Sequence, residues 1–245
     1  MNTFIPMFPD EQLYNAEITK YIRWEYAKYP HGLLFGSTGS GKTYALKIWL
    51  GRISKYIPDS ELILCDYKSD ADFAFADSFQ NFYRFNDCMN GLKYALQTLQ
   101  YRQQEITASR HLVILVFDEW ASFVSNLPKK DAEQAKSDLA TLLMLGRSFN
   151  VQVIISQQRV DAVYFNSSRD NFSVVIGMGA LSKESVNMMY TEYKDAINPN
   201  KSQGHGSMIM GNQLHEIIVP YVSDVNKLHS AILTAINRYS SDESH

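Results

Sequence analysis

The sequence predicts an α/β fold in which a mostly parallel central sheet is flanked by helices. Short, nearly continuous apolar runs alternate with longer amphipathic segments, and the first run leads into a glycine-rich loop that opens a helical segment. Unbroken apolar runs are typical of strands covered on both faces, and strands that alternate with helices favour a parallel sheet. The expected strands comprise residues 32–35, 62–65, 112–117, 151–156 and 174–178.

Two further apolar runs and three helical segments complete the expected architecture. The runs 207–210 and 215–219 flank Gly211-Asn212, which predicts a hairpin at the sheet edge. Residues 11–28 are expected to form a helix that ends before Pro30. Apolar stripes at helical spacing predict two more helices. These stripes are Leu92, Ala95, Leu96 and Leu99, with Asn86 or Asp87 as N-cap, and Ala135, Leu139, Leu142 and Leu143, stopped by Gly146.

The composition is that of an ordinary globular protein and excludes secreted, fibrous and transmembrane classes. The 245 residues carry a formal net charge of −3, so any contact with nucleic acid must come from a local basic patch. The longest apolar run, 112–117, is far shorter than the ~20 residues that span a bilayer. Residues 1–10 lack the pattern of a signal peptide. Because Cys65 and Cys88 are the only cysteines, we expect a cytoplasmic location.

The glycine-rich loop gives the strongest functional signal. Residues 36–43 match G-x-x-x-x-G-K-[ST] between a predicted strand and a helical segment, which is the context that a phosphate-binding loop requires. Its glycines let successive backbone N–H groups face phosphates at the positive end of a helix dipole. Lys42 is expected to reach the β- and γ-phosphates of ATP, and the Thr43 hydroxyl to ligate Mg²⁺. The predicted nucleotide-binding residues are Gly36, Ser37, Thr38, Gly39, Ser40, Gly41, Lys42 and Thr43.

A second apolar strand ends in two acidic residues, which is the Walker B pattern. The run 112–117 leads directly into Asp118-Glu119. Asp118 is expected beside the Mg²⁺ ion, and Glu119 where it can polarise the attacking water as a general base. A kinase needs no such second carboxylate, because its nucleophile is a substrate hydroxyl. The alternative is a solvated acidic turn.

Two weaker signals complete the predicted site. The run 151–156 is followed by Gln157-Gln158-Arg159, where an amide could sense the γ-phosphate and orient water. A polar loop start is the alternative. Arg147 follows Gly146, either as a basic residue at a helix C-terminus or as an arginine finger that reaches the nucleotide of a neighbouring subunit.

Taken in order, these motifs resemble the FtsK/SpoIIIE branch of the FtsK–HerA superfamily, the hexameric double-stranded DNA pumps. Residues 30–43 resemble the family's PHLLIAGATGSGKS, and residues 66–68 resemble its DPK. Residues 146–148 and 155–159 resemble its GR and TQRP, and residues 204–210 its GKGDML. With the Walker B pair, the resemblance covers about residues 29–224 and implies a RecA-like P-loop NTPase fold.

The resemblance also implies a role for each predicted site residue. It places Lys42 and Thr43 on the nucleotide and Mg²⁺, Asp118 on the metal, Glu119 as catalytic base, Gln158 as sensor and Arg147 as a finger acting in trans. Residues 157–160 lack the family's Thr and Pro, so a shift of one position would make Gln157 the sensor. We expect one FtsK-like motor domain over residues 1–239, with 1–28 as an N-terminal helical extension and 240–245 as a polar tail.

The predicted function is ATP-driven translocation of double-stranded DNA by a ring, expected to be a hexamer. The chain is expected to be a bare motor without membrane segments, brought to its DNA by a recruiting partner. Residues 69–78 and 161–171 are candidates for loops that line the channel. A viral-type packaging ATPase or a conjugative coupling ATPase is the alternative within the superfamily. A P-loop switch, a small-molecule kinase or a non-hydrolysing scaffold is the alternative outside it.

Overall fold

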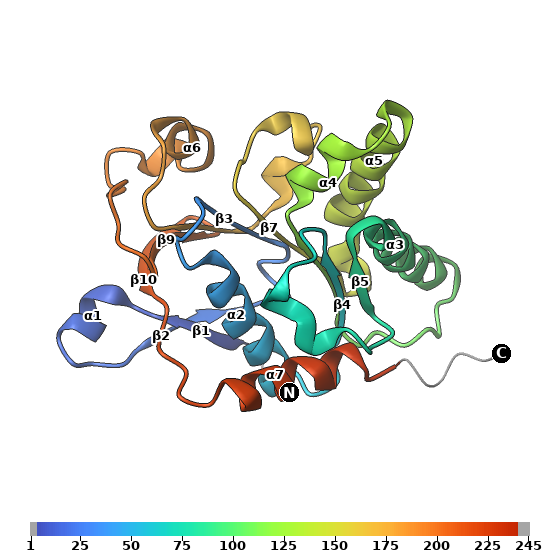
Figure 1. Cartoon of the computed structure of the whole chain (residues 1–245), viewed down its shortest axis with the longest axis horizontal. Helices are drawn as coiled ribbons and strands as arrows, with labels where there is room; N and C mark the ends of the chain where they lie inside the picture. The colour runs from blue at the N-terminus through green and yellow to red at the C-terminus, as the bar shows by residue number, and fades with distance from the viewer. Residues whose placement is uncertain (1–3, 240–245) are drawn as a thin grey trace.

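The computed structural model describes residues 4–239 and has a central eight-stranded sheet (Figure 1). Its strands are β3 (Gly32–Gly36), β4 (Glu61–Asp66), β5 (Phe82–Arg84), β6 (Val113–Asp118), β7 (Val151–Gln157), β8 (Val174–Met178), β9 (His205–Met210) and β10 (Gln213–Ile218). The strand order is β10-β9-β8-β3-β7-β6-β4-β5, and the strands from β8 to β5 run parallel. The predicted mostly parallel α/β fold is confirmed.

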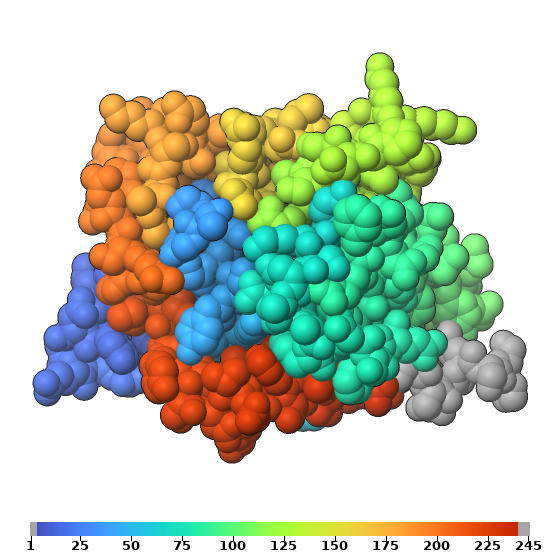
Figure 2. Space-filling view, in the orientation of Figure 1, coloured from blue at the N-terminus to red at the C-terminus, as the bar shows by residue number. Residues whose placement is uncertain are grey.

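Helices cover both faces of this sheet. The face of α2 (Lys42–Tyr56) and α7 (Val225–Ile236) lies opposite the face of α3 (Cys88–Gln104), α4 (Trp120–Asn126) and α5 (Lys129–Leu145). Side chains alternate between the two: in β3, Leu34 packs in the core beside α2, whereas Leu33 and Phe35 pack in the core beside α3 and α5. The space-filling view shows α7, in red, below α2, in blue (Figure 2).

The helices predicted from the two apolar stripes are α3 and α5. Asp87 is the N-cap residue of α3, but its side chain makes no capping hydrogen bond. The α5 helix ends at Leu145, with Gly146 as its C-cap residue, as predicted. The short helix α6 (Lys183–Met189) follows β8 at the carboxyl edge of the sheet.

The N-terminal segment differs from the predicted helix over residues 11–28. The strands β1 (Ile5–Pro9) and β2 (Tyr21–Trp24) pair antiparallel, with the short helix α1 (Glu11–Asn15) between them. The helix ends before Glu17, whose φ of 60° is left-handed. In β2, Ile22 and Trp24 are buried and Arg23 is exposed, which is the two-residue period of a strand. The expectation of a helical extension over residues 1–28 is therefore wrong where the structure describes it.

Packing against the sheet explains why a hairpin replaces the helix. The Trp24 ring meets Trp49 of α2 edge-to-face, with 5.2 Å between the ring centroids. The Trp24 indole Nε1 donates a hydrogen bond of 2.7 Å to the carbonyl of Tyr29. A strand places Ile22 and Trp24 on one face, where both are buried in the core beside α2.

The predicted edge hairpin is confirmed as β9 and β10. Met210 pairs with Gln213 across a two-residue turn of Gly211 and Asn212. Gly211 has a φ of 61°, which such short turns require at a central position. The predicted tail, 240–245, lies outside the described residues. Over residues 4–239, no helix combines the length and the apolar character needed to cross a bilayer.

Candidate nucleotide-binding site

The predicted phosphate-binding loop connects β3 to α2 at the carboxyl edge of the sheet. Gly39 and Gly41 have φ values of 80° and 91°, in the left-handed region that favours glycine. Gly41 is the N-cap residue of α2, and no side chain caps this helix end. The first N–H groups of α2 therefore keep their capacity to bond a ligand. A loop of this conformation at a helix N-terminus is suited to bind a phosphate group.

Two residues that lie 77 positions apart in the chain meet beside this loop. Lys42 Nζ lies 3.3 Å from Glu119 Oε1, and each side chain is only 8% exposed. Glu119 follows β6 directly and has a left-handed φ of 62°, a conformation that costs a non-glycine residue roughly 1–2 kcal/mol. Ser122 Oγ donates a hydrogen bond of 3.4 Å to Glu119 Oε2. The structure therefore brings together the predicted phosphate-binding lysine and the predicted catalytic base.

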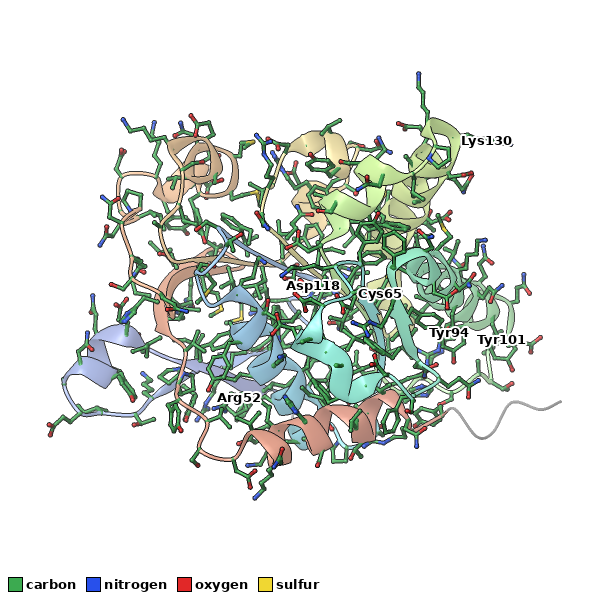
Figure 3. The ribbon with its side chains drawn as sticks, in the orientation of Figure 1. Arg52, Cys65, Tyr94, Tyr101, Asp118 and Lys130 are labelled. Carbon is green, nitrogen blue, oxygen red and sulfur yellow. The ribbon has the colours of Figure 1, made fainter. Side chains whose placement is uncertain are left out.

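Asp118, the last residue of β6, is a buried carboxylate near the centre of the molecule (Figure 3). It is 4% exposed, and its Oδ1 has no hydrogen-bond partner within residues 4–239. Burial raises the pKa of Asp118 to about 6, although the positive charge of Lys42 opposes the shift. An unbonded oxygen on a buried carboxylate is a situation that a bound cation would relieve.

The residues around Asp118 fit a magnesium ion that is shared with a nucleotide. In the described part of the chain, no group of three or more His, Cys, Asp or Glu side chains could hold a metal ion. Mg²⁺ commonly takes one or two protein ligands and completes its shell with phosphate oxygens and water. Asp118 supplies a buried carboxylate, and Thr43 lies in the first turn of α2 with its side chain partly exposed.

The two candidate amide sensors, Gln158 and Gln157, lie at the end of β7, between the strand that leads to the phosphate loop and the strand that ends in Asp118. β7 lies between β3 and β6, with Gln157 opposite Phe35 and Ser156 opposite Asp118. Gln157 is fully buried, and its amide donates to the carbonyl of Arg159. Gln158 is exposed. It lines a cleft of about 430 Å³ together with Gly36, Ser37, Ser182 and Met188.

Arg147 lies at the other end of the same strand. It belongs to a 3₁₀ turn, Gly146–Phe149, that precedes β7, whereas Gln157 ends β7. A strand of seven residues is about 20 Å long. Arg147 is exposed, and its Nε donates a hydrogen bond of 3.2 Å to the carbonyl of Ala27. Within one chain, the structure does not bring Arg147 to the phosphate loop.

Two features of the site lie beyond the residues that the sequence motifs predict for it. Asp66 ends β4 and lies opposite Asp118 in the parallel register. It is 1% exposed, and burial raises its pKa. Gly204, just before β9, donates a hydrogen bond of 3.0 Å to the carbonyl of Ser40 in the phosphate loop. The sequence pattern could have pointed to Asp66, because Asp66, like Asp118, is an aspartate at the end of a buried apolar run.

Comparison with known proteins confirms the resemblance drawn from the motifs. No protein-family model matches the chain. The chain is 25% identical over 221 residues to the FtsK domain-containing protein YdcQ of Bacillus subtilis (strain 168). That match covers 83% of this chain and 46% of YdcQ, so this chain spans less than half the length of that relative.

Solved structures with the same fold come from several transport systems. The pCW3 conjugation coupling protein TcpA, in a monomer form with ATPγS, has a TM-score of 0.72 at 17% identity, covering 95% of this chain and 74% of TcpA. The type VII secretion ATPase EccC of Thermomonospora curvata has a TM-score of 0.71 at 18% identity. The match covers 96% of this chain and 31% of EccC. The genome packaging NTPase B204 of Sulfolobus turreted icosahedral virus 2, in complex with AMPPCP, has a TM-score of 0.53 at 16% identity. The match covers 78% of this chain and 98% of B204. The chain has the RecA-like P-loop fold of these ATPases.

Proposed function

We propose that this chain binds ATP with Mg²⁺ and hydrolyses it to move double-stranded DNA, as one subunit of a ring. The observation that carries the proposal is the contact of 3.3 Å between Lys42 and Glu119, beside the phosphate loop and Asp118, whose Oδ1 has no hydrogen-bond partner in the described residues. The DNA substrate is supported by the sequence similarity to an FtsK domain-containing protein. It is also supported by the fold shared with a conjugation coupling protein and a genome packaging NTPase.

The proposed chemistry follows from the positions of these residues. Residues 36–43 bind the phosphates, with Lys42 on the β- and γ-phosphates, and Thr43 and Asp118 hold Mg²⁺. The bound ion would offset the charge that develops on the phosphate oxygens. Phosphate competes with Glu119 for Lys42, so nucleotide binding frees the Glu119 carboxylate. Glu119 then accepts the proton of the water that attacks the γ-phosphorus, and ADP leaves with the electron pair of the broken P–O bond.

A ring supplies the group that one chain lacks at its own site. Gln158 is proposed as the sensor of the γ-phosphate, because it lines the cleft beside Ser37 while Gln157 is buried. Arg147 is exposed and lies away from its own phosphate loop, so its proposed role as a finger is toward the nucleotide of a neighbouring subunit. The proposal includes six subunits and a recruiting partner, which rest on the family resemblance. It also includes a cytoplasmic location, which rests on the family resemblance and on the presence of two cysteines.

The two predicted channel loops differ in their suitability for DNA. Residues 69–78 contain Asp70, Asp72 and Asp77 and no basic residue, which disfavours contact with a phosphate backbone. Residues 161–171 contain Arg169 together with Asp161 and Asp170, and the exposed Arg159 just before them has its Nε 3.4 Å from Asp161. We propose Arg159 and Arg169 as the DNA contacts, because these two arginines from each subunit would add up around one channel.

The fold shared with EccC favours a second candidate, an ATPase that moves polypeptide rather than DNA. The test is the steady-state ATPase rate with and without a duplex of several hundred base pairs, alongside Lys42→Ala. Several-fold stimulation by duplex, absent in the variant, supports the DNA motor. An ATPase rate that is the same with and without duplex contradicts DNA as the substrate and favours the second candidate. ATP binding without turnover contradicts hydrolysis and favours a scaffold.

A further inference from the structure

Residues 69–78, which we call the strap, connect the carboxyl end of β4 to β5. The strap contains a 3₁₀ helix, Ala71–Ala76, whose Phe73 and Ala76 are buried in the core beside α2. Phe75 stacks on His229 of α7 with 3.8 Å between the ring centroids. In the space-filling view, the teal surface that includes the strap adjoins α2, in blue, and α7, in red (Figure 2).

Charged contacts tie the strap to its neighbours on two sides. Lys47 of α2 lies 3.3 Å from Asp72, and Lys47 stands one helical turn after Thr43. Arg84 of β5 makes two contacts with the strap: Nη1 lies 2.8 Å from Asp77 Oδ1, and Nη2 donates a hydrogen bond of 2.6 Å to the carbonyl of Asp70. The strap is thereby fixed to the helix that begins at the phosphate loop and to the edge strand of the sheet.

Asp66 lies between the strap and Asp118, the residue proposed to hold Mg²⁺. Its Oδ1 accepts a hydrogen bond of 3.0 Å from the backbone N–H of Ser69, at the start of the strap. Its Oδ2 lies 3.8 Å from Arg84 Nε and has no hydrogen-bond partner among the residues described. Asp66 also lies opposite Asp118 on the adjacent strand, and adjacent strands are about 4.8 Å apart. Two buried carboxylates, each with a free oxygen, therefore lie side by side.

We propose that Asp66 and Arg84 are positioning residues that make the strap respond to Mg²⁺ at Asp118. The inference rests on the proposed function in one respect, namely that ATP binds with Mg²⁺. With Mg²⁺ bound beside Asp118, the Asp66 carboxylate would be drawn toward the metal and the Arg84 guanidinium pushed away from it. The contact of 3.8 Å between Asp66 and Arg84 is longer than either contact of Arg84 with the strap, so it weakens first. The Ser69 N–H then loses its acceptor, and the strap loosens at the end nearest the metal.

Hydrogen–deuterium exchange tests this coupling on the full chain, with ATPγS bound in the presence of Mg²⁺ or of EDTA. We expect amides in residues 68–79 to exchange at least ~3-fold faster with Mg²⁺ than with EDTA, because a local contact controls their opening. Asp66→Asn and Arg84→Gln remove this difference. Arg52→Gln is the matched control, since Arg52 donates to the carbonyl of Pro6 and lies over the ring of Tyr21, both in the N-terminal hairpin. It keeps the difference.

The outcomes separate a coupling role from a structural one. If Arg84 only supports the fold, Arg84→Gln speeds exchange of the strap but leaves the Mg²⁺-dependent difference intact, which overturns the proposal. Arg84→Lys restores part of the difference, because it keeps the charge and loses the second contact. ATPγS binding is measured on the same samples by calorimetry. Binding with Mg²⁺ and an unresponsive wild-type strap overturns the coupling alone, whereas failure to bind ATPγS overturns the proposed function as well.

Discussion

Lys42 Nζ lies 3.3 Å from Glu119 Oε1, and both side chains are buried. The group expected to hold the γ-phosphate and the group expected to activate water thus neutralise each other when no phosphate is present. In the proposed mechanism, a phosphate that binds Lys42 competes with Glu119 for the ammonium group. The pair would then link the availability of the proposed base to the arrival of the nucleotide.

Lys42→Ala is expected to weaken nucleotide binding strongly, because it removes the cation proposed to hold the phosphates and leaves the buried Glu119 carboxylate without its ion pair. The dissociation constant for ATPγS should rise by at least ~100-fold, as measured by calorimetry. Lys55→Ala, at an exposed position of the same helix, is the control and should bind as the wild type does. Equal affinity in the two variants would contradict the role of Lys42.

Glu119→Gln should keep binding and stop turnover. Loss of a general base lowers the rate by about 100-fold or more. The amide no longer competes as an anion for Lys42, so ATPγS should bind as tightly as to the wild type or more tightly. The comparison uses ATP turnover and ATPγS affinity, with exposed Glu105→Gln as the control. Unchanged turnover in Glu119→Gln would remove Glu119 as the base.

The two adjacent glutamines should separate into a functional and a structural residue. Gln158→Ala is expected to lower kcat by about 10-fold or more with little change in stability, since Gln158 is exposed beside Ser37. Gln157→Ala should instead lower the free energy of unfolding by about 1–3 kcal/mol, because a buried amide that bonds the Arg159 carbonyl is lost. Urea unfolding and turnover of both variants decide the assignment. The reverse pattern would make Gln157 the sensor.

The buried His31 side chain is expected to make the free energy of unfolding depend on pH. It is 1% exposed, and burial lowers its pKa to about 4 from the usual 6.5. The unfolded chain therefore binds a proton at a pH where the folded protein does not. The stability contributed by neutral His31 is complete above pH 6.5 and is lost as the pH falls toward 4, by about 3 kcal/mol in all.

His31→Asn tests this dependence. Asn keeps an oxygen acceptor for the N–H of Val153, which now bonds His31 Nδ1 at 3.1 Å, and it tolerates the left-handed φ of 59°. Urea unfolding at pH 7.5 and 4.5 should show a larger loss in the wild type than in the variant, by about 2–3 kcal/mol. Equal losses would mean that His31 titrates normally.

The sequence predicts the central strands well because each is an apolar run buried on both faces, as in β6 and β7. It also predicts the phosphate loop, since the motif is local. The N-terminal hairpin could not be predicted in this way: residues 11–28 have apolar residues at helical spacing, and the packing of Trp24 on Trp49 decides against a helix. Strand order likewise depends on distant pairing. For that reason the position of β7 between β3 and β6, and the contact of Lys42 with Glu119, emerge only from the structure.

Displacement of a third strand tests most directly whether ATP turnover drives movement of this protein along duplex DNA. A labelled oligonucleotide bound as a triplex at the end of a long duplex is released only by a protein that travels to it. We predict release that requires ATP and Mg²⁺, that stops in Lys42→Ala and Glu119→Gln, and that takes longer as the duplex is lengthened. ATP hydrolysis stimulated by duplex, with the third strand never displaced, would contradict translocation.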